Sequence, residues 1–260
     1  VFCDRLIHHS LLVGVKASGT KLIRFKHNNL SELETLFRKF RQNKPNKRAL
    51  VITESLFSME GTTAPIKEIS KLCIKYDSKL LIDEAHSFGV MGSEGRGESF
   101  GLKEPISIIS GTFGKAFGSG GAFLATDHLT GEDLIQNCGA FRYTTALAPA
   151  LCASALAALN LIKDNPDWGR KLQDKSIYLR EKLSQIGWAK PLGKGPIISL
   201  ILGSDELAID YQKKLEAQGF LTVAIRPPTV PEGKSRLRLI IRRNTPIQTF
   251  ERIFKVLINK

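Results

Sequence analysis

The sequence lacks a long hydrophobic run. Nowhere do 18 consecutive apolar residues occur, so we expect no membrane-spanning helix. The start of the chain also has no basic segment followed by an apolar stretch, which argues against a secretory leader. Cysteine is scarce, with four residues that show no paired spacing: Cys3, Cys73, Cys138 and Cys152. This pattern is typical of a reduced, cytoplasmic protein rather than of a disulfide-stabilised one.

Acidic residues are also in short supply. The 260-residue chain holds 38 lysines and arginines against 25 aspartates and glutamates, a net charge of +13. Such an excess favours anionic partners, among them nucleic acid, a phosphorylated cofactor, coenzyme A or an acidic carrier protein. Because the sequence has no zinc-finger spacing and no RNA-binding strand motif, we expect no nucleic-acid binding. A uniformly solvated basic surface is the other explanation of the charge.

Strand-like and helix-like segments alternate through the first half of the chain, although residues 1–10 show no strand or helix pattern. We expect one helix at residues 31–40, with Ser31 as its N-cap and Glu34 completing a capping box. The alternation predicts an α/β domain with a mainly parallel sheet, whose ligand crevice lies beyond the carboxyl ends of its strands. The expected strands are 48–55, 79–86, 106–113 and 121–126, with a further helix at 65–77.

The pattern changes near Ala146. The alanine- and leucine-rich segment that follows predicts a long buried helix. The final part reads as strand, helix, strand, strand and a last helix from Ile247 to Asn259, which predicts a smaller C-terminal α/β domain. We therefore expect a large domain at 1–148, a connecting helix at 149–170 and a small domain at 171–260.

An aspartate ends one of the predicted strands. Asp83 is followed three residues later by His86, within "LLIDEAHSFGVMGSEGRG". A carboxylate at this place could ligate a metal, act as a base, hold a protonated ring nitrogen or simply cap the following turn. The local spacing offers no convincing third metal ligand.

A single lysine lies in the segment "SGTFGKAFGSGGAF", among five glycines and three phenylalanines. The amine of Lys115 could attack a carbonyl and form a Schiff base, or it could be a surface lysine in a glycine loop. Glycine permits a close approach of the backbone to a flat ligand. Together with Asp83, His86 and Thr112, this segment suits pyridoxal phosphate: a lysine for the aldehyde, a carboxylate for the pyridinium nitrogen and a donor for the ring hydroxyl.

Six segments, in this order, resemble the α-oxoamine synthase family of fold-type I pyridoxal-phosphate enzymes. They are "HHSLL", "TESLFSMEG", "LIDEAHSFGVMGSEGRG", "GTFGKAFGSGGAF", "FRYTTALAP" and "RPPTVPEGKSRLRL". The resemblance implies an α/β fold of the PLP-dependent transferase fold type I, with a mainly parallel sheet in the large domain and a smaller C-terminal α/β domain. Members of the family carry a long portion before the first motif, so we expect this chain to be an N-terminally incomplete member.

The resemblance also implies roles for individual residues. Lys115 would bind the cofactor as a Schiff base, Asp83 would pair with its ring nitrogen, and His86 would hydrogen-bond its ring oxygen. His8 would stack on the ring, and Arg238 would bind the carboxylate of the amino-acid substrate. Further implied contacts are Ser58, Thr112, Thr144 and Thr145 to the cofactor, the last two across the interface of a homodimer, and Thr229 and Arg226 to the acyl substrate.

Within the family, "FRYTTALAP" and "RPPTVPEGKSRLRL" look most like the branch that acts in biotin biosynthesis. That branch condenses L-alanine with a pimeloyl thioester of coenzyme A or of an acyl-carrier protein, and gives 8-amino-7-oxononanoate, CO2 and a free thiol. The alternatives are a sister activity (glycine C-acetyltransferase, 5-aminolevulinate synthase or serine palmitoyltransferase) and a non-catalytic remnant that serves as an association scaffold.

Overall fold

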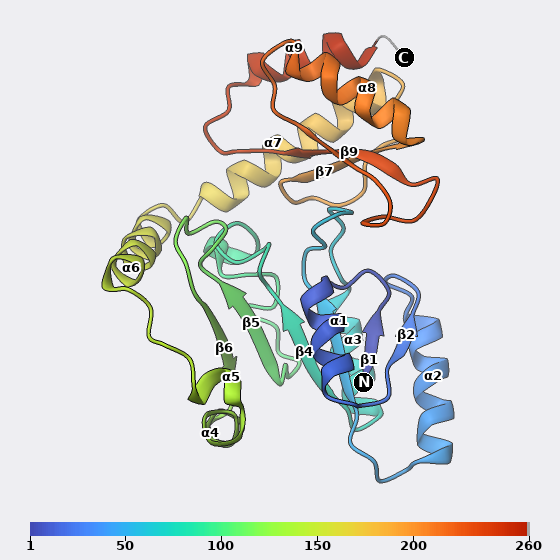
Figure 1. Cartoon of the computed structure of the whole chain (residues 1–260), viewed down its shortest axis with the longest axis vertical. Helices are drawn as coiled ribbons and strands as arrows, with labels where there is room; N and C mark the ends of the chain where they lie inside the picture. The colour runs from blue at the N-terminus through green and yellow to red at the C-terminus, as the bar shows by residue number, and fades with distance from the viewer. Residues whose placement is uncertain (259–260) are drawn as a thin grey trace. The chain divides into compact units, whose positions relative to one another are not determined.

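The computed structural model describes residues 1–258, which fall into two compact units (Figure 1). Unit 1 comprises Val1–Phe57 and Ala64–Gly169. Unit 2 begins at Arg170 and also includes Ser58–Thr63, a short segment that lies between two elements of unit 1 in the sequence. The predicted domain boundaries at residues 148 and 170 stay a prediction.

Unit 1 is built on a six-stranded sheet in the order β2-β1-β3-β4-β5-β6. Strands β1 to β5 are parallel, and β6 pairs antiparallel with β5, so the predicted mainly parallel sheet is confirmed. Strand β1 was not expected from the sequence, because it is only three residues long and all three are buried, which leaves no alternation to read. The strands are β1 (Phe2–Asp4), β2 (Ile23–Phe25), β3 (Leu50–Glu54), β4 (Lys79–Asp83), β5 (Ile108–Thr112) and β6 (Ala122–Thr126).

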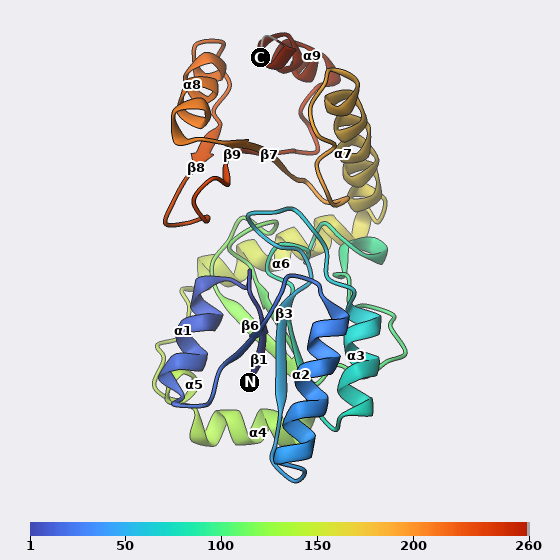
Figure 2. The same ribbon diagram turned by 90° about the vertical axis from the view of Figure 1, so that its right-hand side faces the viewer.

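Helices cover both faces of this sheet. Helix α1 (His9–Ala17) lies on one side of the strands, and α2 (Leu30–Asn43) and α3 (Ile66–Lys75) lie on the other (Figure 2). Side chains alternate along a strand, so β1, β3 and β4 each contribute to two clusters. Cys3 and Ile52 pack with Val15 of α1. The larger cluster, on the α2 and α3 side, holds Phe2, Phe25, Leu33, Phe37, Val51, Ile69, Leu80 and Ile82.

The predicted capping box of α2 is wrong by two residues. The helix begins after Asn29, whose side chain accepts a hydrogen bond from the backbone N–H of Glu32. Glu32 in turn accepts one from the backbone N–H of Lys26. Asparagine caps as well as serine does, so the sequence permits either start. Glu34 instead forms an ion pair with Lys75 of α3, at 2.6 Å.

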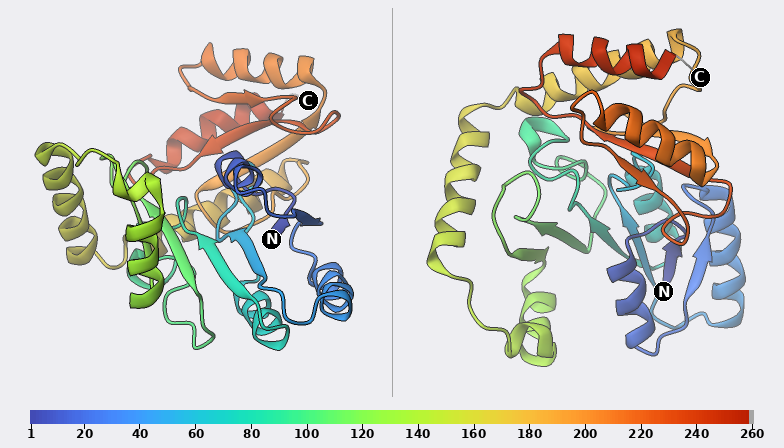
Figure 3. Two further views of the ribbon diagram at one scale, coloured as in Figure 1. Left: turned by 60° about the horizontal axis from the view of Figure 1, so that its bottom comes forward. Right: turned by 45° about the horizontal axis from the view of Figure 1, so that its top comes forward.

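After β6 the chain continues through α4 (His128–Asn137), α5 (Gly139–Arg142) and α6 (Pro149–Asp164), at the end of the sheet (Figure 3). The expectation that this alanine- and leucine-rich helix is buried is wrong, since α6 has no buried residue. Leu156 and Leu161 are 59% and 55% exposed, and Leu129 of α4 is 80% exposed. The segment is as apolar as its sequence indicates, but within residues 1–258 no element covers these side chains.

Unit 2 has an antiparallel three-stranded sheet in the order β7-β9-β8. Its helices lie on one face of the sheet, where Leu200, Leu237 and Leu239 are buried. Among residues 1–258, no helix combines the length and apolar character needed to cross a bilayer. The elements are α7 (Trp168–Gln185), β7 (Ile197–Gly203), α8 (Asp205–Glu216), β8 (Val223–Ile225), β9 (Ser235–Ile240) and α9 (Ile247–Ile258); the predicted end of the last helix, Asn259, lies outside the described residues.

The segment 58–63 is attached to unit 2 by an ion pair and by close backbone packing. Arg236 Nη1 lies 3.0 Å from Glu60 Oε1 and also donates to the carbonyl oxygen of Met59 at 3.3 Å. Gly61 has a φ of +71°, and a Cβ atom added there would lie 2.2 Å from the carbonyl oxygen of Ile197. Glycine is therefore required at position 61 both for its backbone angle and for its lack of a side chain.

We expect Gly61→Ala to destabilise the protein more than Gly19→Ala does. Gly19 has a similar φ of +67° but has open space where a Cβ would lie, so the pair separates the contact from the backbone strain. The positive φ should cost about 1–2 kcal/mol in both variants, and the collision about 1–3 kcal/mol more at position 61 alone. Denaturant unfolding measures both, and equal losses would contradict the packing described.

Candidate active site

The carboxyl ends of the parallel strands bring together residues that are distant in the sequence. Glu54 at the end of β3 lies in register with Asp83 at the end of β4, and Asp83 lies in register with Ser110 of β5. Residues in register on neighbouring strands project from the same face. Ile52 and Leu81, two residues earlier on β3 and β4, belong to the cluster beneath α1. Asp83 and Glu54 are therefore on the face of the sheet that α1 covers.

Asp83 is a largely buried carboxylate with few partners. Its Oδ1 accepts a hydrogen bond from the backbone N–H of Ala85 at 2.9 Å, and no residue in 1–258 donates to Oδ2. Burial raises the pKa of Asp83, and the Ala85 N–H and the nearby positive charges of Lys115 and His8 offset part of that effect. The carboxylate therefore has room for a further cationic hydrogen-bond donor.

His8 lies at the N-terminus of α1, where it is the N-cap residue. Its Nδ1 lies 2.8 Å from Ser10 Oγ and accepts from the backbone N–H of Ser10 at 3.3 Å. These contacts hold the exposed ring at the end of the helix that covers Asp83. The capping position thus explains how a residue 75 positions earlier in the chain comes close enough to influence that carboxylate.

Lys115 lies in the loop between β5 and β6, and its side chain is exposed rather than buried. The loop is closed by backbone hydrogen bonds, including Gly118 N–H to the Lys115 carbonyl (3.0 Å) and Ser119 N–H to the Phe113 carbonyl (2.9 Å). Gly118 and Gly121 have φ angles of +58° and +96°, which favour glycine. The glycines therefore shape a tight turn that carries the lysine past the end of β5.

Thr112 and the phenylalanines fix the base of this loop. Thr112 Oγ1 donates to the Gly121 carbonyl (3.0 Å) and accepts from the Gly114 N–H (3.1 Å). The rings of Phe88 and Phe117 stack with their centroids 4.8 Å apart, and Phe113 and Phe123 pack against them. Phe88 follows His86 by two residues, so this aromatic cluster joins the lysine loop to the turn after β4.

The turn that carries His86 is held by Glu84, a carboxylate that is 1% exposed. Its Oε2 accepts from Ser55 Oγ (2.6 Å) and from Ser87 Oγ, and its Oε1 accepts from the Ser99 N–H (2.7 Å). The backbone N–H of Glu98 also donates to Oε2 (3.2 Å). This Glu84 network ties the end of β3 and the loop at 97–99 to the residues between Asp83 and His86.

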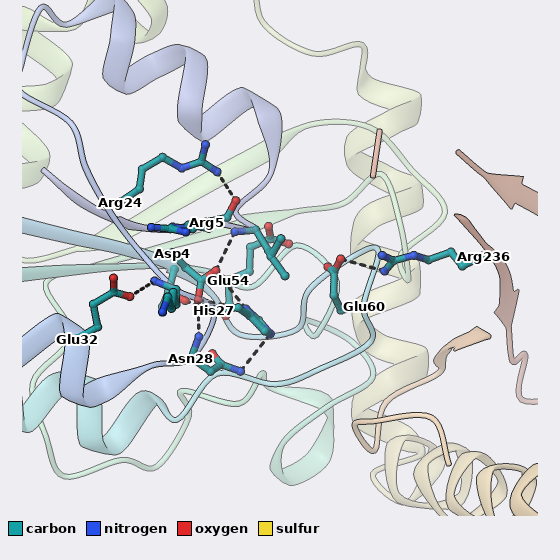
Figure 4. A network of polar contacts seen from close by, with 12 residues as sticks. Asp4, Arg5, Arg24, His27, Asn28, Glu32, Glu54, Glu60 and Arg236 are labelled. Carbon is teal, nitrogen blue, oxygen red and sulfur yellow. Dashed lines mark hydrogen bonds and ion pairs between the residues drawn. The ribbon is translucent and has the colours of Figure 1, made fainter. Parts of the chain in front are cut away.

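A separate polar cluster fixes the end of β1. The fully buried Asp4 carboxylate accepts from the backbone N–H groups of Leu6 and Asn28, both at 2.8 Å, and lies 3.1 Å from His27 Nδ1 (Figure 4). The His27 ring packs edge-on against Phe57 at 4.4 Å. Asp4 is thus saturated by structural contacts, unlike Asp83 at the end of β4, which is separated from β1 by β3. Within residues 1–258, no three His, Cys, Asp or Glu side chains gather as a metal site.

The other predicted site residues lie elsewhere. Thr144 and Thr145 are exposed between α5 and α6, and their side chains make no hydrogen bond within residues 1–258. Ser58 is buried and belongs to unit 2. The remaining three are also in unit 2: Arg226 and Thr229 in the exposed turn after β8, where the Thr229 N–H donates to the Arg226 carbonyl, and Arg238 on β9.

Three comparisons with known proteins agree with this arrangement. The chain belongs to the aminotransferase class I and II family, which it matches over residues 1–257. More particularly, it is 39% identical over 260 residues to a putative 8-amino-7-oxononanoate synthase of Acetivibrio thermocellus, covering 99% of this chain and 66% of that protein. It is 35% identical over 255 residues to the 8-amino-7-oxononanoate synthase of Lysinibacillus sphaericus, covering 97% and 65%.

Solved structures show the same fold. A serine palmitoyltransferase from S. paucimobilis with a bound PLP–myriocin aldimine is 26% identical, with a TM-score of 0.91 over 99% of this chain and 65% of that one. The 8-amino-7-oxononanoate synthase of Francisella tularensis is 30% identical, with a TM-score of 0.84 over 99% and 73%. The predicted α-oxoamine synthase relationship and the fold-type I architecture are confirmed. The chain spans about two thirds of the length of the curated relatives that it matches.

One buried carboxylate near the site, Glu54, was not identified in the sequence. Glu54 ends the apolar run "LVITE" as Asp83 ends "LLID", and it is 2% exposed. The same signal, a charged residue at the end of a buried strand, would have found it. Glu84 is expected from the sequence at the same strand end as Asp83, but its role could not be assigned, because its partners come from three different segments.

We expect Asp83→Asn to stabilise the cofactor-free chain at pH 7. The pKa of Asp83 is raised in the folded state, so its contribution to stability is complete below the unfolded value of about 4 and is lost as the pH rises through the folded value. The asparagine keeps an acceptor for the Ala85 N–H but carries no charge. Thermal unfolding should show a higher midpoint for the variant at pH 7, with the gap closing toward pH 4.

Asp127→Asn is the matched control with the opposite sign. Hydrogen bonds from the Thr130 N–H and hydroxyl lower the pKa of Asp127, so its contribution is present above the unfolded value and is lost as the pH falls. This variant should be no more stable than the parent at pH 7. An Asp83→Asn protein that unfolds below the parent at pH 7 would show that its charge is stabilised, not disfavoured, in the fold.

Proposed function

We propose that this chain belongs to a pyridoxal-phosphate enzyme that joins L-alanine to a pimeloyl thioester of coenzyme A or of an acyl-carrier protein. The products are 8-amino-7-oxononanoate, CO2 and the free thiol, a step of biotin biosynthesis. The observation that carries the proposal is the buried, under-partnered Asp83 with the charges of Lys115 and His8 close to it. The relatives named as 8-amino-7-oxononanoate synthases support the choice of substrates.

The residues present fit the cofactor. Lys115 lies on an exposed loop next to Asp83, so its Nζ is available to hold the aldehyde carbon. Asp83 Oδ2 has no donor within residues 1–258 and would accept the N–H of a protonated pyridine ring. When bound, pyridoxal phosphate supplies an electron-accepting ring that stabilises negative charge at the α-carbon of the amino acid.

The surroundings of Asp83 suit it to hold a proton on the ring nitrogen of the cofactor. A buried carboxylate holds a proton on a neighbouring nitrogen more strongly than an exposed one, because the low dielectric strengthens their attraction. In the cofactor-free chain the same burial raises the pKa of Asp83. The charged form of Asp83 is therefore less stable without a cationic partner than with one. This difference favours binding of the protonated ring.

Lys115, His86 and His8 would complete the part of the site that unit 1 contributes. When it is not bonded to the cofactor aldehyde, Lys115 Nζ would be free to accept the α-proton of the amino acid. His86, in the turn held by the Glu84 network, would donate to the ring oxygen, and His8 would stack on the ring from the end of α1. Thr112 of unit 1 and Ser58 of unit 2 would contact the cofactor.

Residues of unit 2 would bind the carboxylate of the amino acid and the acyl substrate. Arg238 carries a guanidinium whose Nε is buried and has no hydrogen-bond partner within residues 1–258, as expected for a donor kept for a carboxylate. The planar guanidinium can bind the two carboxylate oxygens of L-alanine at once. Arg226 and Thr229, in the exposed turn after β8, would lie along the acyl substrate, and the basic surface of the chain suits coenzyme A or an acidic carrier protein equally.

The exposed apolar surface of α4 to α6 supports a homodimer. Leu129, Leu156 and Leu161 are each more than half exposed, which is unusual for side chains of this size on one surface. Thr144 and Thr145 lie within the same surface, between α5 and α6, so they would be available to the cofactor of the partner subunit.

The first test is an absorbance spectrum of the purified chain with pyridoxal phosphate. We expect a Schiff-base band, distinct from that of free pyridoxal phosphate, which Lys115→Ala abolishes because the variant lacks the amine proposed to bind the aldehyde. L-Alanine should shift the band at a lower concentration than glycine or L-serine does. A preference for glycine or L-serine would indicate a sister activity, and no band at all would contradict cofactor binding by this chain and favour a scaffold.

A second test concerns association. Leu156→Glu combined with Leu161→Glu should lower the dimer affinity by at least about 10-fold, since it places charges in an apolar contact. Sedimentation at several protein concentrations measures this. Ile74→Glu is the control, because Ile74 of α3 is 56% exposed outside this surface. Equal effects of the two changes, or a parent chain that is monomeric at all concentrations, would contradict the homodimer.

A further inference from the structure

One row of the unit 2 sheet carries two polar side chains that have no hydrogen-bond partner. Ser199 of β7 and Val223 of β8 both lie in register with Arg238 of β9, which is the central strand. Directly opposite residues of antiparallel strands project from the same face, with their Cα atoms about 4.5–5.5 Å apart. The neighbours Leu200 and Leu239, which project from the other face, are buried beneath the helices.

Both polar groups of this row are unsatisfied. Ser199 is 9% exposed, and its Oγ is buried without a hydrogen-bond partner among residues 1–258. Arg238 Nε is likewise buried without a hydrogen-bond partner among residues 1–258. Buried polar atoms in folded proteins are nearly always hydrogen-bonded, so two unpaired atoms in one row indicate a place where something else supplies the partner.

Two more deeply buried arginines of unit 2 show that unpaired guanidinium groups are not a general feature of the fold. Arg236, two residues earlier on the same face, is neutralised by Glu60 at 3.0 Å. Arg180 of α7 has no acidic partner but donates to the carbonyl oxygens of Leu192, Ser176 and Ile197. Arg238 has neither a counter-ion nor such a set of carbonyl acceptors within residues 1–258.

We propose that the Ser199 hydroxyl is a second hydrogen-bond donor for the carboxylate that Arg238 binds, so that the amino-acid substrate is recognised at two points of this row. The inference rests on the proposed function, because it takes the ligand to be the carboxylate of an amino acid. Ser199 would then help the protein to select amino acids with a carboxylate over analogues that carry a neutral group in its place.

The chemistry of the pair suits this ligand. A carboxylate has about four lone-pair sites on its two oxygens, and a bidentate guanidinium occupies only two of them. The Ser199 hydroxyl loses no hydrogen bond when it rotates toward the ligand, since it makes none in the free chain. Val223 beside the pair is 51% exposed, so an apolar side chain borders the row and gives a neutral polar ligand no compensating contact.

The test compares Ser199→Ala with Thr222→Val. Thr222 Oγ1 is also buried without a partner, but Thr222 directly precedes Val223 and so lies on the opposite side of the strand. Neither variant loses a hydrogen bond within the described residues, so both should keep the parent's unfolding temperature. In the cofactor-loaded protein, Ser199→Ala should weaken L-alanine binding about 10-fold, as for a lost hydrogen bond to a charged group, and Thr222→Val should not. L-Alaninol, which has no carboxylate, should bind equally to all three proteins.

A second readout needs no cofactor. Acetate should shift the Arg238 Nε–H signal in NMR spectra of the isolated chain, and Ser199→Ala should raise the acetate concentration required. If Ser199→Ala folds poorly, Ser199→Cys keeps the side-chain size with a weak donor and should give the same loss. Unchanged L-alanine and acetate affinities in these variants, or an equal loss for L-alaninol, would overturn the proposal. A missing Lys115-dependent band would instead refute the proposed function, while the acetate titration would still decide the role of Ser199.

Discussion

The buried carboxylate of Glu84 is the constraint on which the rest of the site depends. A charge that is 1% exposed and has no basic partner among its hydrogen bonds would destabilise the fold by several kcal/mol if it were not solvated by donors. Two serine hydroxyls and two backbone N–H groups supply that solvation, and they come from the end of β3, the turn after β4 and the loop at 97–99. Gly97 belongs to the same arrangement, because a Cβ there would lie 2.9 Å from the Glu84 carboxylate. The positions of Asp83 and His86, on either side of Glu84, follow from this network.

Much of the fold and part of the candidate site could be predicted from the sequence, and each success had a local cause. Strands β3 and β4 are mostly apolar runs, and Asp83 ends one of them, so the alternation of strands and helices placed it at the carboxyl end of a strand. Strand β1 was missed because three residues carry no period, and the N-cap of α2 was misplaced because Asn29 and Ser31 are equally good caps. The exposure of α6 could not be foreseen, since an apolar helix has the same sequence whether or not another element covers it. Ser199 became visible only through strand register and burial.

Two kinds of ionisable group are removed from solvent in this chain, and they differ in whether neighbouring residues satisfy their hydrogen-bonding atoms. Asp4, Glu84, Arg180 and Arg236 have their hydrogen-bonding groups occupied by neighbouring residues, so they stabilise the fold and have little capacity left for a ligand. Asp83 and Arg238 are less deeply buried and lack that satisfaction, and burial shifts the pKa of both toward the neutral form. A protein keeps such groups at a cost in stability, which a bound cation at Asp83 and a bound anion at Arg238 would offset.

The attachment of residues 58–63 to unit 2 affects the order in which the two units can fold during synthesis. Glu60 is synthesised 176 residues before Arg236, its ion-pair partner, and Gly61 packs on Ile197, which also emerges late. On the ribosome, unit 1 therefore cannot order the connection between β3 and α3 until most of unit 2 has been translated. The two units are not separable by a single proteolytic cut either, because a break at residue 169 leaves this connection on the wrong fragment. Folding of the two units is coupled through a segment of six residues, and a nascent chain that stalls early would expose it.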